Sequence, residues 1–188
     1  MAYTFSRRDF MKYTALAAAA VAVSGSLTGC SGNPNQPTGK IGDTLSFGGS
    51  SGIFGIGGSS DKHTLVAEGT AYNEGTLTCV FEHYPVTDGT SCTVDRYQLR
   101  IVKEDGTVQW VIASKAGVEF SVTNGSGSLK KEEKITNTLK ITGLAELAAD
   151  AKEVYIQYYP RHNALGDEND AYSDVFATWD VTSLFVEG

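Results

Sequence analysis

A short segment near the C-terminus, Gly166-Asp167-Glu168-Asn169-Asp170, concentrates side-chain oxygens of the kind that bind metal ions. Calcium takes six to eight oxygen ligands, and acidic residues that alternate along one loop supply several of them. We therefore consider Asp167, Asn169 and Asp170 as candidate calcium ligands. The segment lacks the Asp-x-Asp-x-Asp-Gly spacing of a calcium-binding loop, so a solvated acidic loop is the alternative interpretation.

Serine and histidine residues give little indication of catalysis. Gly48-Gly49-Ser50-Ser51-Gly52 matches the G-x-S-x-G pattern of a nucleophile elbow, but that elbow needs a strand before it, a helix after it and an α/β scaffold. Residues 48–60 are instead rich in glycine and predict a loop. The three histidines, His63, His83 and His162, have none of the close spacings of a zinc site. We therefore expect no enzyme active site and no cofactor.

Aromatic residues near position 155 predict a binding surface. Side chains that follow one another along a strand point to opposite faces, so Tyr155, Gln157 and Tyr159 share one face. Exposed aromatic rings stack on sugar rings or pack against a protein partner. These three residues are therefore candidates for binding. The opposite faces of the strands are expected to build the core, with Trp110, Tyr158 and Trp179.

The elements that would position these residues are strands, because apolar residues recur with a period of two from Thr64 onward. Glu104-Asp105-Gly106 predicts a hairpin turn between two of the strands. One or two turns of helix are expected at 144–151. The strands are predicted at 41–47, 77–82, 97–102, 108–112, 118–122, 139–141, 154–159 and 175–181.

The run Asn-Thr-Leu-Lys-Ile-Thr-Gly-Leu at 137–144, followed by Asp150 and an aromatic strand, resembles part of a known fold. It is similar to the passage between strands E and F of immunoglobulin-like and fibronectin type III domains. The resemblance implies an all-β fold, an immunoglobulin-like β-sandwich of about seven to eight antiparallel strands over residues 41–188. It also offers a second role for Tyr155, as the corner tyrosine whose hydroxyl bonds to nearby backbone.

The first thirty residues have the layout of an export signal. Ser6-Arg7-Arg8-Asp9-Phe10-Met11-Lys12 precedes an apolar run, which is shorter than the roughly 20 residues that span a bilayer, and Leu27-Thr28-Gly29-Cys30 follows. This order resembles a bacterial twin-arginine signal that ends in a lipoprotein processing site. The resemblance implies that residues 1–29 form the signal peptide. The export system would then read Arg7, Arg8, Phe10 and Lys12.

By the same resemblance, Cys30 carries lipid and becomes the first residue of the mature chain. A polar tether at 30–40 would then hold the domain at the extracytoplasmic face of the cell membrane. Two further cysteines, Cys79 and Cys92, remain. Two thiols in an exported protein predict one disulfide, with two reduced core thiols as the alternative.

The net charge of the mature chain excludes one class of binding partner. The chain has 15 basic and 22 acidic residues, and removal of residues 1–29 leaves 12 and 21, a net charge near −9. An acidic surface repels the phosphates of nucleic acids, so nucleic-acid binding is excluded. With its Gly42-Asp43-Thr44 opening, the chain resembles small immunoglobulin-like lipoproteins of Gram-positive bacteria. We expect a membrane-anchored module that binds an envelope protein or glycan, with a structural accessory of an envelope complex or a hydrolase as alternatives.

Overall fold

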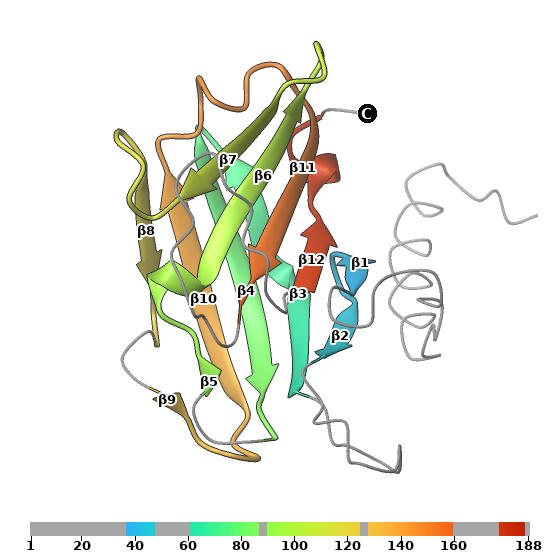
Figure 1. Ribbon diagram of the computed structural model, residues 1–188, viewed down its shortest axis with the longest axis vertical. Coiled ribbons are helices and arrows are strands. Elements are labelled where there is room, and N and C mark those ends of the chain that lie inside the picture. The colour runs from blue at the N-terminus through green and yellow to red at the C-terminus, as the bar shows by residue number, and fades with distance from the viewer. Residues whose placement is uncertain (1–36, 48–60, 87–89, 125–127, 160–176, 187–188) are drawn as a thin grey trace, which may run out of the picture. The chain divides into compact units, whose positions relative to one another are not determined.

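The computed structural model describes residues 37–47, 61–86, 90–124, 128–159 and 177–186, all within the compact unit Ser31–Gly188 (Figure 1). The glycine-rich segment 48–60 lies outside the described residues. The strands are β1 (Thr38–Lys40), β2 (Thr44–Phe47), β3 (Asp61–Asn73), β4 (Thr76–Tyr84), β5 (Thr90–Ser91), β6 (Tyr97–Lys103), β7 (Val108–Ile112), β8 (Glu119–Val122), β9 (Ser128–Leu129), β10 (Ile135–Thr142), β11 (Ala151–Tyr158) and β12 (Ala177–Asp180). Two 3-10 helices, η1 (Val94–Arg96) and η2 (Thr182–Leu184), complete the elements of this part. No helix within it is long and apolar enough to span a membrane.

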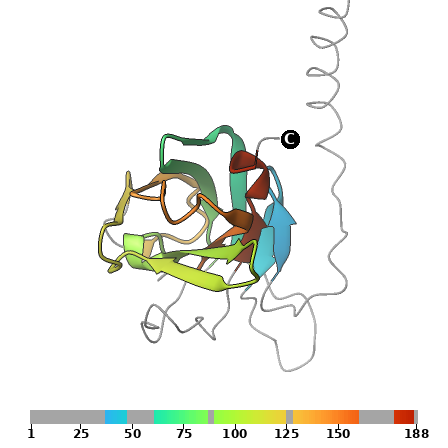
Figure 2. The ribbon, with the colours of Figure 1, turned by 90° about the horizontal axis from the view of Figure 1, so that it is seen from above.

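The strands build two large sheets and one small pair. The first sheet has the order β1-β12-β11-β6-β7, the second has the order β2-β3-β4-β10-β8, and β5 pairs with β9. Seen from above, the two large sheets are two layers, with the β6–β7 hairpin in one and the β3–β4 hairpin in the other (Figure 2). Among the described strands, β1 and β12 are parallel and all other pairs are antiparallel.

The strand order is that of an immunoglobulin-like sandwich. β3-β4-β10-β8 corresponds to strands A-B-E-D of such a domain, and β12-β11-β6-β7 corresponds to G-F-C-C′. The predicted all-β sandwich is therefore confirmed, and β10 and β11 occupy the positions of strands E and F. The described strands outnumber the seven or eight expected because β1, β3 and the two-residue strands β5 and β9 are absent from the predicted set, whereas β2 lies within the strand expected at 41–47.

Alternation along the strands fixes the inner face of each sheet. In β4, Leu77, Cys79 and Phe81 are buried, and the residues between them are partly accessible. A fully buried side chain of this size stabilises the fold by about 1.5–3 kcal/mol relative to its exposed state. The predicted alternation of β4 is therefore confirmed, and the first sheet adds to the same core Leu99, Ile101, Val154, Ile156 and Trp179.

Strand β7 presents the opposite face from the one expected. Trp110, predicted in the core, lies opposite Arg100 of β6 and is only half-buried. Val111, opposite Leu99, is the residue of β7 that enters the core. The sequence Val-Gln-Trp-Val-Ile places apolar residues in both alternating sets, so its pattern does not select a face.

The last residues of the predicted tether are part of the fold. They form β1, which pairs with β12 through the main chain. After β1 the backbone turns at Gly42, whose φ of 96° suits a residue without a Cβ. The Asp43 carboxylate supports this turn by accepting a hydrogen bond from the Lys40 N–H at 2.8 Å. β1 is held by main-chain hydrogen bonds to β12 and not by buried apolar side chains. Its polar sequence, Thr-Gly-Lys, therefore does not predict a strand.

The connection between β10 and β11 contains the helical turn expected at 144–151. The Ala148 N–H donates to the Leu144 carbonyl oxygen at 2.9 Å, which closes one turn of α-helical type. The Ala151 N–H then donates to the Ala148 carbonyl oxygen at 3.1 Å and leads into β11. Leu144 is fully buried, so this connection is fixed to the core by a side chain as well as by its backbone.

Gly143 is predicted to be intolerant of any side chain. Its φ is 83°, and a Cβ there would lie 2.1 Å from the Gly117 carbonyl oxygen. Gly143→Ala should therefore lower the free energy of unfolding by more than the ~1–3 kcal/mol that a left-handed non-glycine residue costs. Gly117→Ala is the matched control, because its φ is 78° with no atom within 4 Å of the added Cβ. Urea unfolding compares the two variants, and equal losses would contradict the steric argument.

Candidate functional site

An arginine flanked by two aromatic residues lies on the outer face of the first sheet. In the register of that sheet, Arg100 of β6 is opposite Trp110 of β7 on one side and Tyr155 of β11 on the other. The guanidinium carbon is 5.8 Å from the centre of the Trp110 ring and 5.3 Å from the centre of the Tyr155 ring. Both distances allow cation–π attraction. We call these three half-buried residues the aromatic ladder.

The guanidinium of Arg100 keeps its hydrogen-bonding capacity. In the part of the chain that the structure describes, it has contacts to the two rings and no hydrogen-bond or ion-pair partner. Guanidinium donors lie in the plane of the group, so rings that cover its faces leave them available. The aromatic ladder therefore presents a positive charge with unused donors between two apolar rings.

Two acidic residues neighbour the aromatic ladder, Glu153 on the same strand as Tyr155 and Asp180 on β12. The Tyr155 hydroxyl donates to the Glu153 carboxylate at 2.9 Å, and Asp180 of β12 is opposite Tyr155 in the strand pair. Burial raises the pKa of Tyr155, and the hydrogen bond to Glu153 raises this pKa further, whereas Arg100 lowers it. Tyr155 is therefore neutral at pH 7, and its hydroxyl bonds to a side chain rather than to the backbone of a tyrosine corner.

Two of the three residues predicted for a binding face are buried. Tyr155 is half-buried, but Gln157 is 5% exposed and Tyr159 is 0% exposed. The Gln157 side-chain carbonyl accepts from Gln98 at 2.5 Å and from the Tyr159 hydroxyl at 3.3 Å. Its amide donates to Thr178 at 3.0 Å. Alternation identified the shared face correctly, but it does not report how much of that face is covered.

A second polar group lies between the two sheets. His63 of β3 and His83 of β4 are direct partners in the second sheet, and Tyr97 of β6 and Tyr158 of β11 are direct partners in the first. All four side chains are 0% exposed. The centre of the Tyr158 ring is 4.7 Å from the centre of each imidazole. Each sheet therefore contributes one pair to a buried polar layer.

Hydrogen bonds run through this layer in one direction. Asn137 of β10 donates from Nδ2 to the Tyr97 hydroxyl oxygen at 3.1 Å. His83 Nε2, 3.0 Å away, can accept the Tyr97 proton when His83 is the tautomer protonated on Nδ1. His83 then carries its proton on Nδ1 and donates it to His63 Nδ1 at 2.9 Å. We call His63, His83, Tyr97 and Asn137 the histidine network.

Both imidazoles of the histidine network are neutral at pH 7. Burial lowers the pKa of His63 well below its ordinary value, and the neighbouring His83 lowers it further. Burial also lowers the pKa of His83, to about 3. The sequence hides this pair because the two residues lie on separate strands with no ligand spacing. The β3–β4 hairpin brings them together, but its register shifts between Val66 and Ala71.

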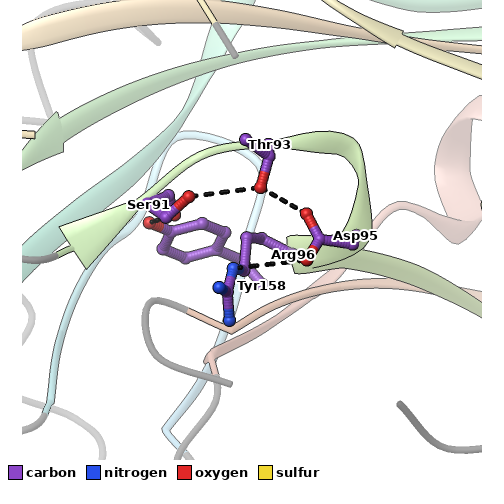
Figure 3. A network of polar contacts seen from close by, with 5 residues as sticks. All are labelled: Ser91, Thr93, Asp95, Arg96 and Tyr158. Atoms are coloured by element: carbon purple, nitrogen blue, oxygen red, sulfur yellow. Dashed lines mark hydrogen bonds and ion pairs between the residues drawn. The ribbon is translucent and has the colours of Figure 1, made fainter. Parts of the chain in front are cut away.

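A third polar group orders the turn before β6 (Figure 3). Ser91 Oγ lies 3.2 Å from Thr93 Oγ1, and the Thr93 hydroxyl donates to the Asp95 carboxylate. Arg96 Nε is 3.7 Å from the same carboxylate, while its Nε and Nη1 are buried without a hydrogen-bond acceptor among the described residues. The Tyr158 hydroxyl donates to the Ser91 carbonyl oxygen at 2.8 Å. These contacts fix η1 and the residues before it against β11.

The structure corrects the predicted disulfide between Cys79 and Cys92, because both are free and buried. Cys79 lies in the middle of β4, whose two edges are occupied by β3 and β10. The segment that carries Cys92 therefore does not return beside β4. The Cys92 thiol instead donates to the Asn124 carbonyl oxygen at 3.0 Å.

Both thiols are predicted to be unreactive in the folded protein. Burial raises the pKa of Cys79 and of Cys92, and this keeps the reactive thiolate scarce. A maleimide reagent should label both residues in denaturant and neither in buffer, as counted by intact-mass measurement. Reduction should leave the mass unchanged. A gain of two hydrogens on reduction would contradict the prediction.

A hollow of about 370 Å³ lies beside the connections before β8 and after β10. Small residues line most of it, including Gly117 and Gly143, together with Leu147 and one acid, Glu146. A ligand site usually combines an apolar cavity with several convergent polar groups. This hollow brings together no such set among the described residues, so the aromatic ladder remains the stronger candidate site.

The other predicted site residues lie outside the described residues. They are Arg7, Arg8, Phe10, Lys12, Cys30, Asp167, Asn169 and Asp170. Within the described ranges, no three His, Cys, Asp or Glu side chains are grouped to hold a metal ion. Calcium binding by the acidic segment therefore stays a prediction.

Comparison with known proteins supports the export signal. The signal sequence of the twin-arginine translocation (TAT) pathway matches residues 4–24, a range that contains Arg7, Arg8, Phe10 and Lys12. No curated protein and no solved structure matches the chain. The chain therefore carries a TAT signal, which directs its export across the cytoplasmic membrane.

Proposed function

We propose that the mature chain is a lipoprotein that works as a binding module on the extracytoplasmic face of the cell membrane. The TAT signal at 4–24 supports the export part of this proposal. Leu27-Thr28-Gly29-Cys30, at the end of that signal, supports lipid attachment to Cys30. The domain begins soon afterwards with β1, so a lipid on Cys30 would keep it close to the membrane.

The aromatic ladder carries the binding part of the proposal. Trp, Tyr and Arg are the residue types most enriched where binding energy concentrates. Here Trp110, Arg100 and Tyr155 lie side by side across three strands on an accessible face. Val108, next to Trp110 on the same face of β7, is 41% exposed and extends the apolar surface. The partner is an envelope protein or glycan, since the acidic mature chain repels nucleic acid.

A hydrolase is the less favoured of the proposed functions. Catalysis needs a base within reach of substrate. His63 and His83 are the strongest acid–base pair among the described residues, yet both are 0% exposed. Their hydrogen bonds are directed to each other and to Tyr97, which fits a structural role in the core.

The anchoring is tested by fractionation of cells that express the full chain. Cys30→Ala should leave an unprocessed precursor without lipid, and mass spectrometry of the N-terminus would show it. Arg7→Lys with Arg8→Lys should retain the precursor in the cytoplasm. Ser31→Ala is the matched control and should be processed normally. A Cys30→Ala protein that is still cut before residue 30 would contradict the anchoring proposal.

The binding is tested by capture from a cell-envelope extract on immobilised mature protein. Arg100→Gln with Trp110→Leu should lose components that the wild type retains. Lys140→Gln removes one positive charge from the exposed face of β10 and should behave as wild type. Equal capture by all three proteins would contradict binding at the aromatic ladder and favour the structural accessory.

A further inference from the structure

We infer that the aromatic ladder binds an acidic saccharide, a sugar ring that carries a carboxylate or a phosphate group. This inference rests on the proposed binding function and specifies its ligand. The feature that decides the ligand class is the position of Arg100, in the middle of the surface rather than at its rim.

Any partner that covers the aromatic ladder takes the Arg100 guanidinium out of water. Removing an unpaired charge from water is costly, and the cost is offset only by an opposite charge with good hydrogen-bond geometry. In the described part of the chain, no carboxylate is paired with Arg100. The partner must therefore bring the anion itself.

The nearby carboxylates of the chain do not occupy that position. Glu153 is engaged by the Tyr155 hydroxyl at 2.9 Å, and Asp180 lies beyond Tyr155, on β12. The edge of the guanidinium is thus left for a ligand. Carboxylate and phosphate groups both fit the paired N–H donors of arginine in a two-bond arrangement.

The rings on either side of Arg100 favour a sugar as the carrier of the anion. Trp110 and Tyr155 are both half-buried, and the parts of their rings that the guanidinium does not cover suit the C–H face of a sugar ring. Val108 widens the apolar surface beside Trp110. A sugar that stacks on these rings would therefore have its acidic group next to the Arg100 guanidinium, between Trp110 and Tyr155.

β7 is the last strand of its sheet, but the backbone at Arg100 itself offers no free edge to an extended acidic peptide. Peptides gain much of their affinity from main-chain hydrogen bonds at a free sheet edge. β6, which carries Arg100, is paired with β11 on one side and with β7 on the other. Its main-chain groups are therefore already used, and recognition at Arg100 depends on side chains.

Calorimetric titration of the mature protein tests the inference with five probes. They are trigalacturonate, its methyl ester, neutral maltotriose, glucose 6-phosphate and triglutamate peptide. Trigalacturonate, glucose 6-phosphate or both should bind, and the pattern between these two identifies the preferred anion. Removing the charge as the methyl ester should weaken binding at least tenfold, and 0.5 M salt should weaken it too.

Variants assign the binding to the aromatic ladder. Arg100→Gln and Trp110→Leu should each weaken binding of the acidic sugars at least tenfold, with melting temperatures that show both are folded. Lys140→Gln should bind as the wild type does. Arg100→Lys keeps the charge but loses the paired donors, so it should restore only part of the affinity.

Three results would overturn the inference. One is binding of maltotriose or the methyl ester as tight as that of trigalacturonate. Another is binding of triglutamate as tight as that of the sugars, which would indicate an acidic peptide site. The third is no binding of any acidic sugar. If envelope capture still depends on Arg100 and Trp110 in that case, the binding function stands and only the ligand class fails.

Discussion

Between pH 7 and pH 5 the free energy of unfolding should fall by roughly 4 kcal/mol because of the histidine network. His63 and His83 are fully buried and neutral, with pKa values that burial holds low in the folded state, about 3 for His83. In the unfolded chain each imidazole has a pKa near 6.5. Acid should therefore destabilise this domain through these two residues well above the folded-state pKa of His83.

The free energy of unfolding falls with pH because the unfolded state takes up protons before the folded state does. Below pH 6.5 the unfolded chain binds a proton on each histidine, whereas the folded chain does so for His83 only near pH 3. The unfolded state therefore gains stability as the pH falls. Each histidine contributes about 1.4 kcal/mol per pH unit in this window. The loss should end only as the pH reaches the folded-state pKa values.

Urea unfolding at pH 7.5, 6.0 and 5.0 measures this dependence. The wild type should show this steep loss. A double variant, His63→Gln with His83→Gln, should be less stable at pH 7.5 but nearly insensitive to pH between 7.5 and 5.0. Equal midpoints for the wild type at pH 7.5 and 5.0 would contradict the neutral buried pair.

Asn137→Asp should lower the free energy of unfolding by at least about 3 kcal/mol, since it changes one atom at the centre of the histidine network. Asn137 is 0% exposed and donates from Nδ2 to the Tyr97 hydroxyl and to the Cys92 carbonyl oxygen, at 3.1 and 3.2 Å. Its Oδ1 accepts from the Thr123 hydroxyl and the Asn124 N–H, each at 3.2 Å. An ionised aspartate accepts all of its bonds, so it leaves the Cys92 carbonyl unsatisfied and buries a charge.

Asn73→Asp is the matched control for this substitution. Asn73 is exposed at the end of β3, so the same chemical change there should cost less than about 0.5 kcal/mol. The two variants are compared by their urea midpoints at pH 7.5. An Asn137→Asp protein as stable as Asn73→Asp would show that the hydrogen bonds of Asn137 do not support the fold.

Alternation predicted the buried face correctly in strands where only one of the two alternating sets of residues is apolar. Leu77, Cys79 and Phe81 in β4 are an example, and their burial is confirmed. β7 has apolar residues in both sets, so only its pairing with β6 decides that Val111 is inside and Trp110 outside. Buried polar residues such as His63 are hidden from such a pattern because their burial depends on partners from other strands.

The aromatic ladder could be found in the sequence only through strand register. The turn at Glu104-Asp105-Gly106 centres the β6–β7 hairpin on Asp105, so residues five positions to either side, Arg100 and Trp110, become neighbours. In the β3–β4 hairpin, counting equal numbers of residues from the turn does not identify the paired residues. Its register shifts between Val66 and Ala71, where Thr70 Oγ1 bonds to the Val66 carbonyl, so the pairing of the two histidines could not be read from their distance to the turn.

The parallel pairing of β1 with β12 has a mechanical consequence. Thr38, Gly39 and Lys40 lie opposite Thr178, Trp179 and Asp180, so the start of β1 and the end of β12 are at opposite ends of the pair. With Cys30 anchored as proposed, a force between the anchor and the C-terminal end of β12 acts along both strands. The hydrogen bonds of the pair then share this force in shear, and they do not open one after another. On the proposed anchoring, β1 is thus placed where the domain would resist being pulled away from the membrane.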